Sequence, residues 1–349
     1  MLQQSSLAPA AALAADVGGP AQPLLTVRGL TKHFPLKNGK LVRAVDGVDF
    51  EVLKGETLGV VGESGCGKST TARLLMHLMD PTAGELVFDG RTVGSRDLSI
   101  KDFRRQVQMV FQDSYASLNP RLTIEDSIAF GPQVHGVSRK ESVARAHHLM
   151  DRVGLAPARF AERYPHELSG GQRQRINIAR ALALQPRMVI LDEAVSALDK
   201  SVEAQVLNLL ADLKREFGLT YVFISHDLGV VHYISDRVMV MYLGQVAEIG
   251  PSDALFAAPA HPYTKALLSS VPSMDPSHRT LVAPLAGDPP NPINPPTGCR
   301  FHPRCPQAAP VCAQAVPAVT PVQLHHAARC LVHEPGSGHP LAATAALAA

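Results

Sequence analysis

Residues 62–69 have the types and spacing of a phosphate-binding loop. The segment GESGCGKS matches the pattern G-x-x-x-x-G-K-[ST] in full. Glycines let the backbone curl so that its N–H groups point at phosphate oxygens, and the next helix adds its positive dipole end. Lys68 would reach the β- and γ-phosphates, and the Ser69 hydroxyl would bind Mg²⁺. The residues expected to contact a nucleotide here are Gly62, Gly65, Cys66, Gly67, Lys68, Ser69 and Thr70.

The neighbours of this loop supply the strand and the helix that the pattern requires. The apolar run 57–61 predicts a buried strand, and Leu74, Leu75 and Leu78 follow the loop with helical spacing. The alternative is a glycine-rich turn without function, which would not need both neighbours. The three segments together predict a strand–loop–helix unit for a nucleotide.

Residues 168–172, with the sequence LSGGQ, form a second candidate surface for an anion. Ser169 is a favourable N-cap, and residues 173–184 behind it have a helical pattern that Pro186 ends. Two glycines and a serine at a helix start present bare N–H groups and a hydroxyl. An ordinary capped turn is the alternative for the pentapeptide alone.

Two acidic residues end a short apolar strand at 188–193. Asp192 has the position of a Mg²⁺ ligand, and Glu193 follows it as a base would. The segment SALD, which ends at Asp199, comes directly afterwards. These neighbours favour the functional interpretation of LSGGQ.

Polar side chains also end two other predicted strands. Residues 221–224 lead to Ser225 and His226, and residues 107–111 lead to Gln112. Ligands of open α/β sheets bind at the C-terminal ends of the strands. We therefore expect Gln112 and His226 at the same edge as the two acids.

Six motifs thus follow one another: the phosphate loop, the strand-end glutamine, LSGGQ, the Asp–Glu pair, SALD and the strand-end histidine. This is the order found in the ATP-binding cassette (ABC) ATPases, which residues 24–270 resemble. The resemblance implies an α/β fold, that of a P-loop NTPase ABC cassette with a RecA-like core. An N-terminal antiparallel β region, a helical subdomain at about 113–180 and a small C-terminal extension would complete it. ATP and Mg²⁺ would be the cofactors, and ATP hydrolysis the activity.

The same resemblance implies roles for the strand-end residues. Gln112 would touch Mg²⁺ and the attacking water, and Asp192 would hold Mg²⁺ through water. Glu193 would polarise that water, and His226 would contact the γ-phosphate. The implied catalytic residues are thus Glu193, His226 and Gln112, and the implied Mg²⁺ site comprises Ser69, Gln112 and Asp192.

Other residues would act between two subunits or on the adenine. The signature would cap a nucleotide bound by the opposite subunit, and Asp199 would lie at the interface. Phe34 stands where the family stacks an aromatic ring, usually tyrosine, on adenine, but a core phenylalanine is the alternative. The signature residues are Ser169, Gly170, Gly171 and Gln172.

Two C-terminal segments resemble the extension of the peptide-importer branch of these ATPases: residues 261–268 (HPYTKALL) and 294–299 (NPPTGC). This implies uptake of dipeptides or oligopeptides, although relatives in the branch carry nickel or glutathione. The implied partners are a second, different ABC ATPase subunit that would complete a heterodimer, two membrane permeases and, indirectly, a solute-binding protein. The chain would lie peripherally on the cytoplasmic face of the inner membrane.

Four of the five cysteines are Cys299, Cys305, Cys312 and Cys330, which are separated by 5, 6 and 17 residues. A reducing cytoplasm disfavours disulfides, and four thiolates in a proline-rich segment suggest a metal centre. The C-x₂₋₄-C pairs of a zinc ribbon are absent from this spacing. Resemblance to the peptide-importer ATPases implies a [4Fe–4S] cluster. Zinc, with help from His302, His325 or His326, and free thiols are the alternatives.

The fifth cysteine, Cys66, lies inside the phosphate loop. Its small side chain is most simply a filler. A helix N-terminus lowers the pKa of a thiol, however, so alkylation of Cys66 could block ATP binding.

Length and composition predict one large domain with an appendage. We expect disorder at 1–23, the ABC ATPase domain at 24–270, the four-cysteine extension at 271–335 and a disordered tail at 336–349. The formal net charge of +2 suggests no nucleic-acid partner. No apolar run approaches the ~20 residues that cross a bilayer, and residues 1–23 lack the charged start of a signal peptide.

Two other classes of P-loop protein lack their signatures here. A GTPase needs an Asn-Lys-x-Asp guanine reader, and no asparagine of this chain precedes a lysine. Soluble ABC proteins of the ribosome or of DNA carry two cassettes or long coiled-coil insertions, and neither is present. Transport is therefore the favoured function.

Overall fold

The computed structural model describes residues 23–37, 39–270 and 287–342. The segment 1–22, for which disorder was predicted, lies outside the described residues. So do residues 271–286 and 343–349.

The N-terminal part forms a four-stranded antiparallel sheet in the order β2-β1-β4-β5. Its strands are β1 (Pro23–Pro35), β2 (Leu41–Leu53), β4 (Ala83–Phe88) and β5 (Arg91–Thr92). Register shifts interrupt the pairing of β1 with β2 between Val27 and His33. This sheet is the predicted N-terminal antiparallel β region.

An eight-stranded sheet forms the centre of the molecule, in the order β11-β12-β10-β9-β3-β8-β7-β6. The five strands from β9 to β6 are parallel, whereas β10 and β12 join the edge in antiparallel pairs. Its strands are β3 (Thr57–Val61), β6 (Val107–Val110), β7 (Met188–Asp192), β8 (Thr220–Ile224), β9 (Arg237–Tyr242), β10 (Gln245–Pro251), β11 (Thr320–Gln323) and β12 (His326–Ala328).

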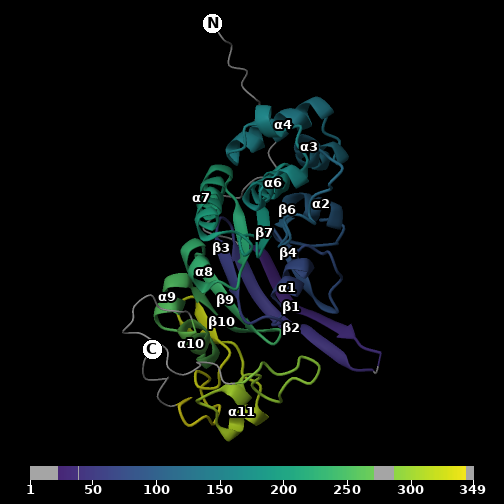
Figure 1. Cartoon of the computed structure of the whole chain (residues 1–349). Helices are drawn as coiled ribbons and strands as arrows, with labels where there is room; N and C mark the ends of the chain where they lie inside the picture. Colours follow the sequence, from purple (N-terminus) through teal and green to yellow (C-terminus); the bar gives the residue numbers. More distant parts are fainter. Residues whose placement is uncertain (1–22, 38, 271–286, 343–349) are drawn as a thin grey trace.

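Helices cover both faces of this sheet and form one end of the molecule (Figure 1). The helices that pack around the cassette are α1 (Lys68–Leu75), α2 (Ile100–Gln106), α7 (Lys200–Phe217), α8 (Leu228–Ile234), α9 (Ser252–Ala257) and α10 (Pro262–Ser269). The end of the molecule predicted as a helical subdomain contains α3 (Ile124–Val134), α4 (Arg139–Arg152), α5 (Pro157–Phe160), η1 (Pro165–Glu167) and α6 (Gly170–Leu182). The extension at the opposite end contains η3 (His302–Arg304) and α11 (Pro310–Gln314).

Two hydrophobic cores lie on the two faces of the central sheet. Side chains alternate along a strand, so Tyr221 and Phe223 of β8 face one core while Val222 and Ile224 face the other. One core joins the sheet to α7, α8 and the helical subdomain, and the other joins it to α1 and the antiparallel sheet. All residues of β3, β7 and β8 are buried, and burial on both faces explains why the strand interiors are apolar rather than alternating.

The C-terminal extension is attached to the cassette by a buried carboxylate. Glu248 of β10 is 0% exposed and accepts hydrogen bonds from the Ala260 N–H (2.7 Å), the His261 N–H (2.9 Å) and His326 Nε2 (2.7 Å). Burial alone would raise its pKa, but the bond from His326 and these N–H groups hold the pKa of Glu248 below its usual value. Glu248 therefore joins β10, the start of α10 and β12 in one buried, hydrogen-bonded contact.

We predicted a disordered tail from 336 onward, and its first residues, 336–342, belong to the part of the chain that the structure describes. His339 is buried, and its Nε2 lies 3.0 Å from the carbonyl oxygen of Gln307. The Ala342 N–H also donates to the His339 carbonyl. The Ala-rich composition of this end suggested disorder, but these contacts hold residues 336–342 against the extension.

No described helix combines the length and the apolar character that a membrane span requires.

Candidate nucleotide-binding site

The phosphate loop joins β3 to α1, as predicted, and its backbone leaves room only for glycine at two points. Gly62 has φ 149° and Gly67 has φ 109°, in the region that disfavours side chains. A Cβ atom at Gly62 would collide with the Met241 carbonyl, and one at Gly67 with the Ala44 carbonyl. The loop is therefore held closely between β9 and β2.

Lys68 lies inside this loop, although lysine is rarely buried. The residue is 6% exposed, and its ammonium donates hydrogen bonds to the carbonyls of Gly62 (2.7 Å) and Glu63 (3.0 Å). Its Nζ also lies 3.8 Å from the Cys66 sulfur. The loop thus holds a positive charge beside its N–H groups, where phosphate oxygens bind.

The two predicted Mg²⁺ ligands of the loop and of β7 lie in direct contact. The Ser69 hydroxyl donates to Asp192 Oδ1 at 3.2 Å. Asp192 is 4% exposed, and burial raises its pKa although the hydrogen bond from Ser69 opposes this. Hard oxygen ligands of this kind suit Mg²⁺.

The three predicted catalytic side chains lie together, with Gln112 and His226 both directed at Glu193. Gln112 Nε2 donates to one carboxylate oxygen at 2.7 Å, and His226 Nδ1 lies 3.6 Å from the other. Glu193 has φ 48°, a left-handed conformation that is uncommon outside glycine, and its N–H donates to the Ile224 carbonyl. Three strand ends thus bring together one carboxylate, one amide and one imidazole.

The signature residues form the start of α6, on a different part of the molecule. Ser169 and Gln172 make a reciprocal capping box, because each side chain bonds to the backbone N–H of the other. A Cβ atom at Gly171 would collide with Val202 of α7, so glycine lets the two helices approach. Within the described residues, no hydrogen bond or ion pair joins the signature to the phosphate loop.

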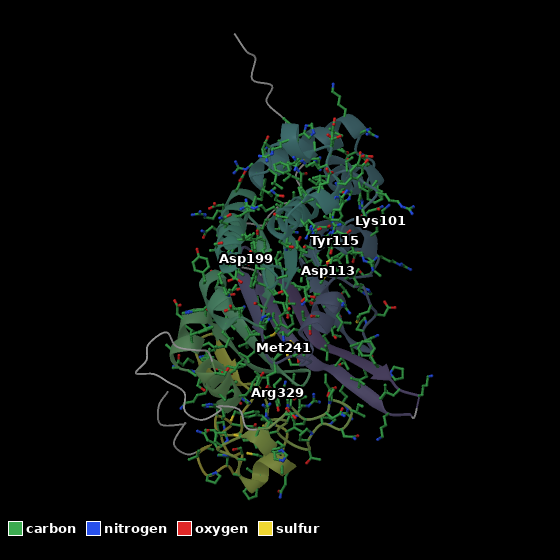
Figure 2. The ribbon with its side chains drawn as sticks, in the orientation of Figure 1. Lys101, Asp113, Tyr115, Asp199, Met241 and Arg329 are labelled. Carbon is green, nitrogen blue, oxygen red and sulfur yellow. The ribbon has the colours of Figure 1, made fainter. Side chains whose placement is uncertain are left out.

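Asp199 is exposed at the N-cap of α7, and its side chain caps no helix N–H. Figure 2 shows it toward the helical subdomain, away from Met241, which borders the phosphate loop. The structure therefore separates the residues predicted to contact the chain's own nucleotide from those predicted to act across an interface.

Two further site predictions have different outcomes. Phe34 is 37% exposed on β1, with the Lys32 ammonium 5.4 Å from its ring centre, so it is not a core phenylalanine. Its stacking on adenine stays a prediction.

Cys66 is buried, and burial raises its pKa against the influence of Lys68. The pKa of Cys66 is therefore raised and not lowered, because desolvation by burial outweighs the influence of Lys68.

Helix α10 and the extension supply contacts to the phosphate loop that the sequence did not predict. The Glu63 N–H donates to the Tyr263 hydroxyl of α10 at 2.9 Å, and Arg304 pairs with the Glu63 carboxylate. Both partners are about 200 residues or more from Glu63 in the sequence. No spacing or periodicity indicates such a contact.

The four C-terminal cysteines line a single cavity together with His261, His302 and His339. Within the described residues, however, no three His, Cys, Asp or Glu side chains have the arrangement of a formed metal site. His326, an alternative zinc ligand, instead bonds to Glu248. The predicted [4Fe–4S] cluster stays a prediction.

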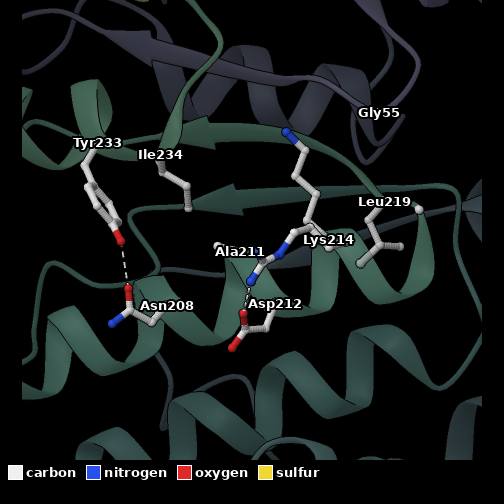
Figure 3. A pocket seen from close by; sticks show the side chains of 10 residues that line it. Gly55, Asn208, Ala211, Asp212, Lys214, Leu219, Tyr233 and Ile234 are labelled. Atoms are coloured by element: carbon white, nitrogen blue, oxygen red, sulfur yellow. Dashed lines mark hydrogen bonds and ion pairs between the residues drawn. The ribbon is translucent and has the colours of Figure 1, made fainter.

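A wide surface hollow lies elsewhere, between α7 and α8 (Figure 3). Its polar side chains pair with one another, as in the hydrogen bond from Tyr233 to Asn208 (2.7 Å) and the contact of Arg215 with Asp212 (2.5 Å). None of the predicted site residues lines it. The nucleotide site is therefore not this hollow.

The fold and the polar strand ends define a P-loop ATPase, and two family models match the chain. The ABC transporter model covers residues 45–196. The model "oligopeptide/dipeptide transporter, C-terminal region" covers residues 247–312.

Curated relatives match most of the chain. The probable peptide ABC transporter ATP-binding protein y4tS of Sinorhizobium fredii is 52% identical, over 90% of this chain and 91% of the relative. The oligopeptide transport ATP-binding protein AppF of Bacillus subtilis is 49% identical, over 88% and 96%.

Solved cassettes share the fold. The cbiO1 protein of Clostridium perfringens, part of the ABC transporter complex cbiONQ, has a TM-score of 0.60 at 28% identity, over 68% of this chain and 91% of that one. A dimeric bacterial cassette, MJ0796, has a TM-score of 0.58 at 29% identity, over 65% and 98%. The chain belongs to the ATP-binding proteins of ABC transporters, and it hydrolyses ATP.

The first prediction concerns the base. In Glu193→Gln the amide cannot accept a proton, so ATP hydrolysis should fall about 10²–10⁴-fold, the usual weight of a positioned general base. ATP binding should persist, because the change keeps the size of the side chain. Steady-state ATPase and ATP-binding assays of the subunit with its partners measure both effects.

Lys68→Ala is the contrasting variant. Lys68 is expected to contact the bound phosphates themselves, so its loss should abolish nucleotide binding as well as turnover. Near-normal hydrolysis by Glu193→Gln would remove Glu193 from the role of base.

Proposed function

We propose that this chain is the ATP-hydrolysing subunit of an ABC importer that takes up dipeptides or oligopeptides. One observation carries the substrate class. The extension after β10 matches the oligopeptide/dipeptide transporter C-terminal model, and it is attached to a cassette with every predicted catalytic residue present. Two curated relatives, at 52% and 49% identity, have peptide or oligopeptide transport in their names.

Each predicted residue then has a step to perform. Lys68 and the loop N–H groups bind the β- and γ-phosphates, and Ser69 with Asp192 and Gln112 holds Mg²⁺. The metal supplies positive charge that stabilises the transferring phosphoryl group. Glu193, held by Gln112 and near His226, orients the attacking water and accepts its proton.

A second cassette completes each nucleotide site. The signature lies apart from the phosphate loop of its own chain, which supports a dimer in which each signature caps the partner's nucleotide. We propose a heterodimer that closes on ATP and moves two membrane permeases through the helical subdomains. This places the chain peripherally on the cytoplasmic face, with a solute-binding protein across the membrane delivering the cargo.

The four thiols at one cavity have the donor chemistry of an iron–sulfur site. Burial raises the pKa of Cys305 to about 11 and that of Cys330 to about 12, and the neighbouring cysteines add to this. Thiols this basic stay protonated at neutral pH unless a cation compensates their charge. We propose that Cys299, Cys305, Cys312 and Cys330 hold a [4Fe–4S] cluster that stabilises the extension.

Uptake in proteoliposomes tests the substrate class. The subunit, reconstituted with its permeases and solute-binding protein, should accumulate a labelled dipeptide or oligopeptide when ATP is enclosed on the cassette side. The same preparation with Glu193→Gln should accumulate only background label. Uptake of nickel or glutathione without competition by peptides would reassign the cargo, and absence of ATP-driven uptake would contradict import.

The signature prediction concerns geometry. Ser169→Arg should leave ATP binding by the isolated subunit unchanged, because Ser169 acts on the partner's nucleotide. ATPase activity of the assembled complex should fall by at least tenfold, through loss of transition-state contacts of about 1.4 kcal/mol or more. In a heterodimer, the nucleotide site that loses activity should be the one formed by the partner's phosphate loop, not the one that contains Lys68.

Ser138→Arg is a matched control, because Ser138 also caps an exposed helix, α4, through the Glu141 N–H. It should affect stability but not turnover. Loss of ATP binding by the isolated Ser169→Arg subunit would contradict action across the interface.

The cluster predicts a colour. Protein purified without oxygen should be brown and carry about four irons per chain, since one [4Fe–4S] cluster uses four thiolates. Cys305→Ser should lose both, whereas Cys66→Ser, which lies outside the cysteine cavity, should keep both. Visible absorption and metal analysis measure this, and colourless protein with zinc or without metal would end the proposal.

A further inference from the structure

The C-terminal extension reaches the phosphate loop through Arg304. Its guanidinium makes a two-pronged ion pair with Glu63, with Nη1 2.8 Å from Oε2 and Nη2 3.0 Å from Oε1. The Arg304 side chain is only 5% exposed. A planar guanidinium bound at both nitrogens fixes the orientation of the carboxylate as well as its distance.

Glu63 belongs to the phosphate loop, and both its backbone N–H and its backbone carbonyl are hydrogen-bonded. Its N–H donates to the Tyr263 hydroxyl at 2.9 Å, and its carbonyl accepts from the Lys68 ammonium at 3.0 Å. The carbonyl of Glu63 also accepts from the Cys66 N–H at 3.3 Å. A movement of Glu63 would therefore move a group that holds Lys68.

Arg304 is itself held in place by a rigid set of rings. Nη1 lies 3.4 Å from the Tyr242 hydroxyl, and the guanidinium carbon lies 6.0 Å from the centre of that ring. Tyr242 contacts Tyr263 and Phe301 with ring centres 4.6 and 5.3 Å apart. These contacts join β9, α10 and the cysteine segment, so the position of Arg304 is not that of a mobile surface side chain.

A second arginine of the extension is connected, through Asp46 of β2, to the strand that carries Phe34. Arg300 donates to the Leu243 carbonyl and pairs with Asp46. The opposite oxygen of Asp46 lies 2.7 Å from Nε2 of His33, the residue before Phe34. The extension thus supports both the phosphate side and the predicted adenine side of the nucleotide site.

We propose that Arg304 is a positioning residue for nucleotide binding, acting through Glu63 to hold the phosphate loop in its binding conformation. A loop that is already ordered loses less conformational entropy when a ligand binds. The extension then contributes to ATP affinity from a segment outside every ATP motif. Arg304 touches the loop, not the reacting phosphate, so it acts on binding more than on chemistry.

The test compares single and double variants of the full-length subunit. Arg304→Gln should weaken Mg²⁺–ADP binding about tenfold, within the range usual for coupling between two sites. Glu63→Gln should have the same effect, and the double variant should be no weaker than either, because both changes remove one interaction. Arg304→Lys should retain part of the affinity, since lysine keeps the charge but not the two-pronged geometry.

Calorimetric titration with ADP measures affinity without turnover. In the assembled transporter, the KM for ATP of Arg304→Gln should rise by about the same factor, with kcat within about twofold of wild type. Loss of a merely structural contact would not raise KM while leaving kcat nearly unchanged.

Arg329→Gln is the matched control. Arg329 is also a part-buried arginine of the extension, and it donates to the carbonyls of Val246 and Pro317, not to the loop. It should lower the thermal midpoint of unfolding while leaving ADP affinity unchanged. If Arg304→Gln does not fold, Arg304→Lys and Glu63→Gln still measure the coupling.

Two results would overturn the proposal. One is wild-type ADP affinity in folded Arg304→Gln or Glu63→Gln with only a lowered thermal midpoint, as in Arg329→Gln. The other is additivity, with the double variant much weaker than either single one, because Arg304 and Glu63 would then act separately.

Discussion

The site depends on the parallel alignment of β3, β6, β7 and β8. Parallel strands end at the same edge, so one sheet brings the phosphate loop, Gln112, Asp192 and Glu193 together from distant parts of the sequence. The strands are buried on both faces, and a slip of one residue would exchange their inward side chains between two cores. The packing that stabilises the sheet therefore also sets the register of the polar strand ends.

The polar groups of the site are buried, and a buried polar group must be paired with a hydrogen-bonding or charged partner. Removing an ionised group from water costs several kcal/mol unless partners compensate, and Lys68 is compensated by carbonyls of its own loop. Asp192 has one hydroxyl partner, and burial raises its pKa although the hydrogen bond from Ser69 opposes this; a cation bound beside it would lower that pKa. The site is thus constructed around groups that favour Mg²⁺ and phosphate charge.

The extension is part of the same framework and not a separate appendage. Strands β11 and β12 lengthen the central sheet, Glu248 anchors them, and Arg300 and Arg304 bond to residues beside and within the nucleotide site. The two arginines are next to cysteines in the sequence: Cys299 precedes Arg300, and Cys305 follows Arg304. Both cysteines line the cysteine cavity, so the same turn carries the arginines and part of the cavity wall. A ligand at the cysteines would therefore stabilise a segment that touches the phosphate loop.

The sequence by itself determined the family, the ATP motifs and the strands that carry them. Loop glycines, a strand-end Asp–Glu pair and buried apolar runs are local patterns, and each has a local physical cause. Only the tertiary structure decided that Phe34 is exposed, that burial raises the pKa of Cys66, and that His339 packs on the extension. It alone also paired Arg304 with Glu63 across 241 residues. Desolvation and long-range ion pairs depend on what surrounds a side chain in space, and no pattern of neighbouring residues encodes that.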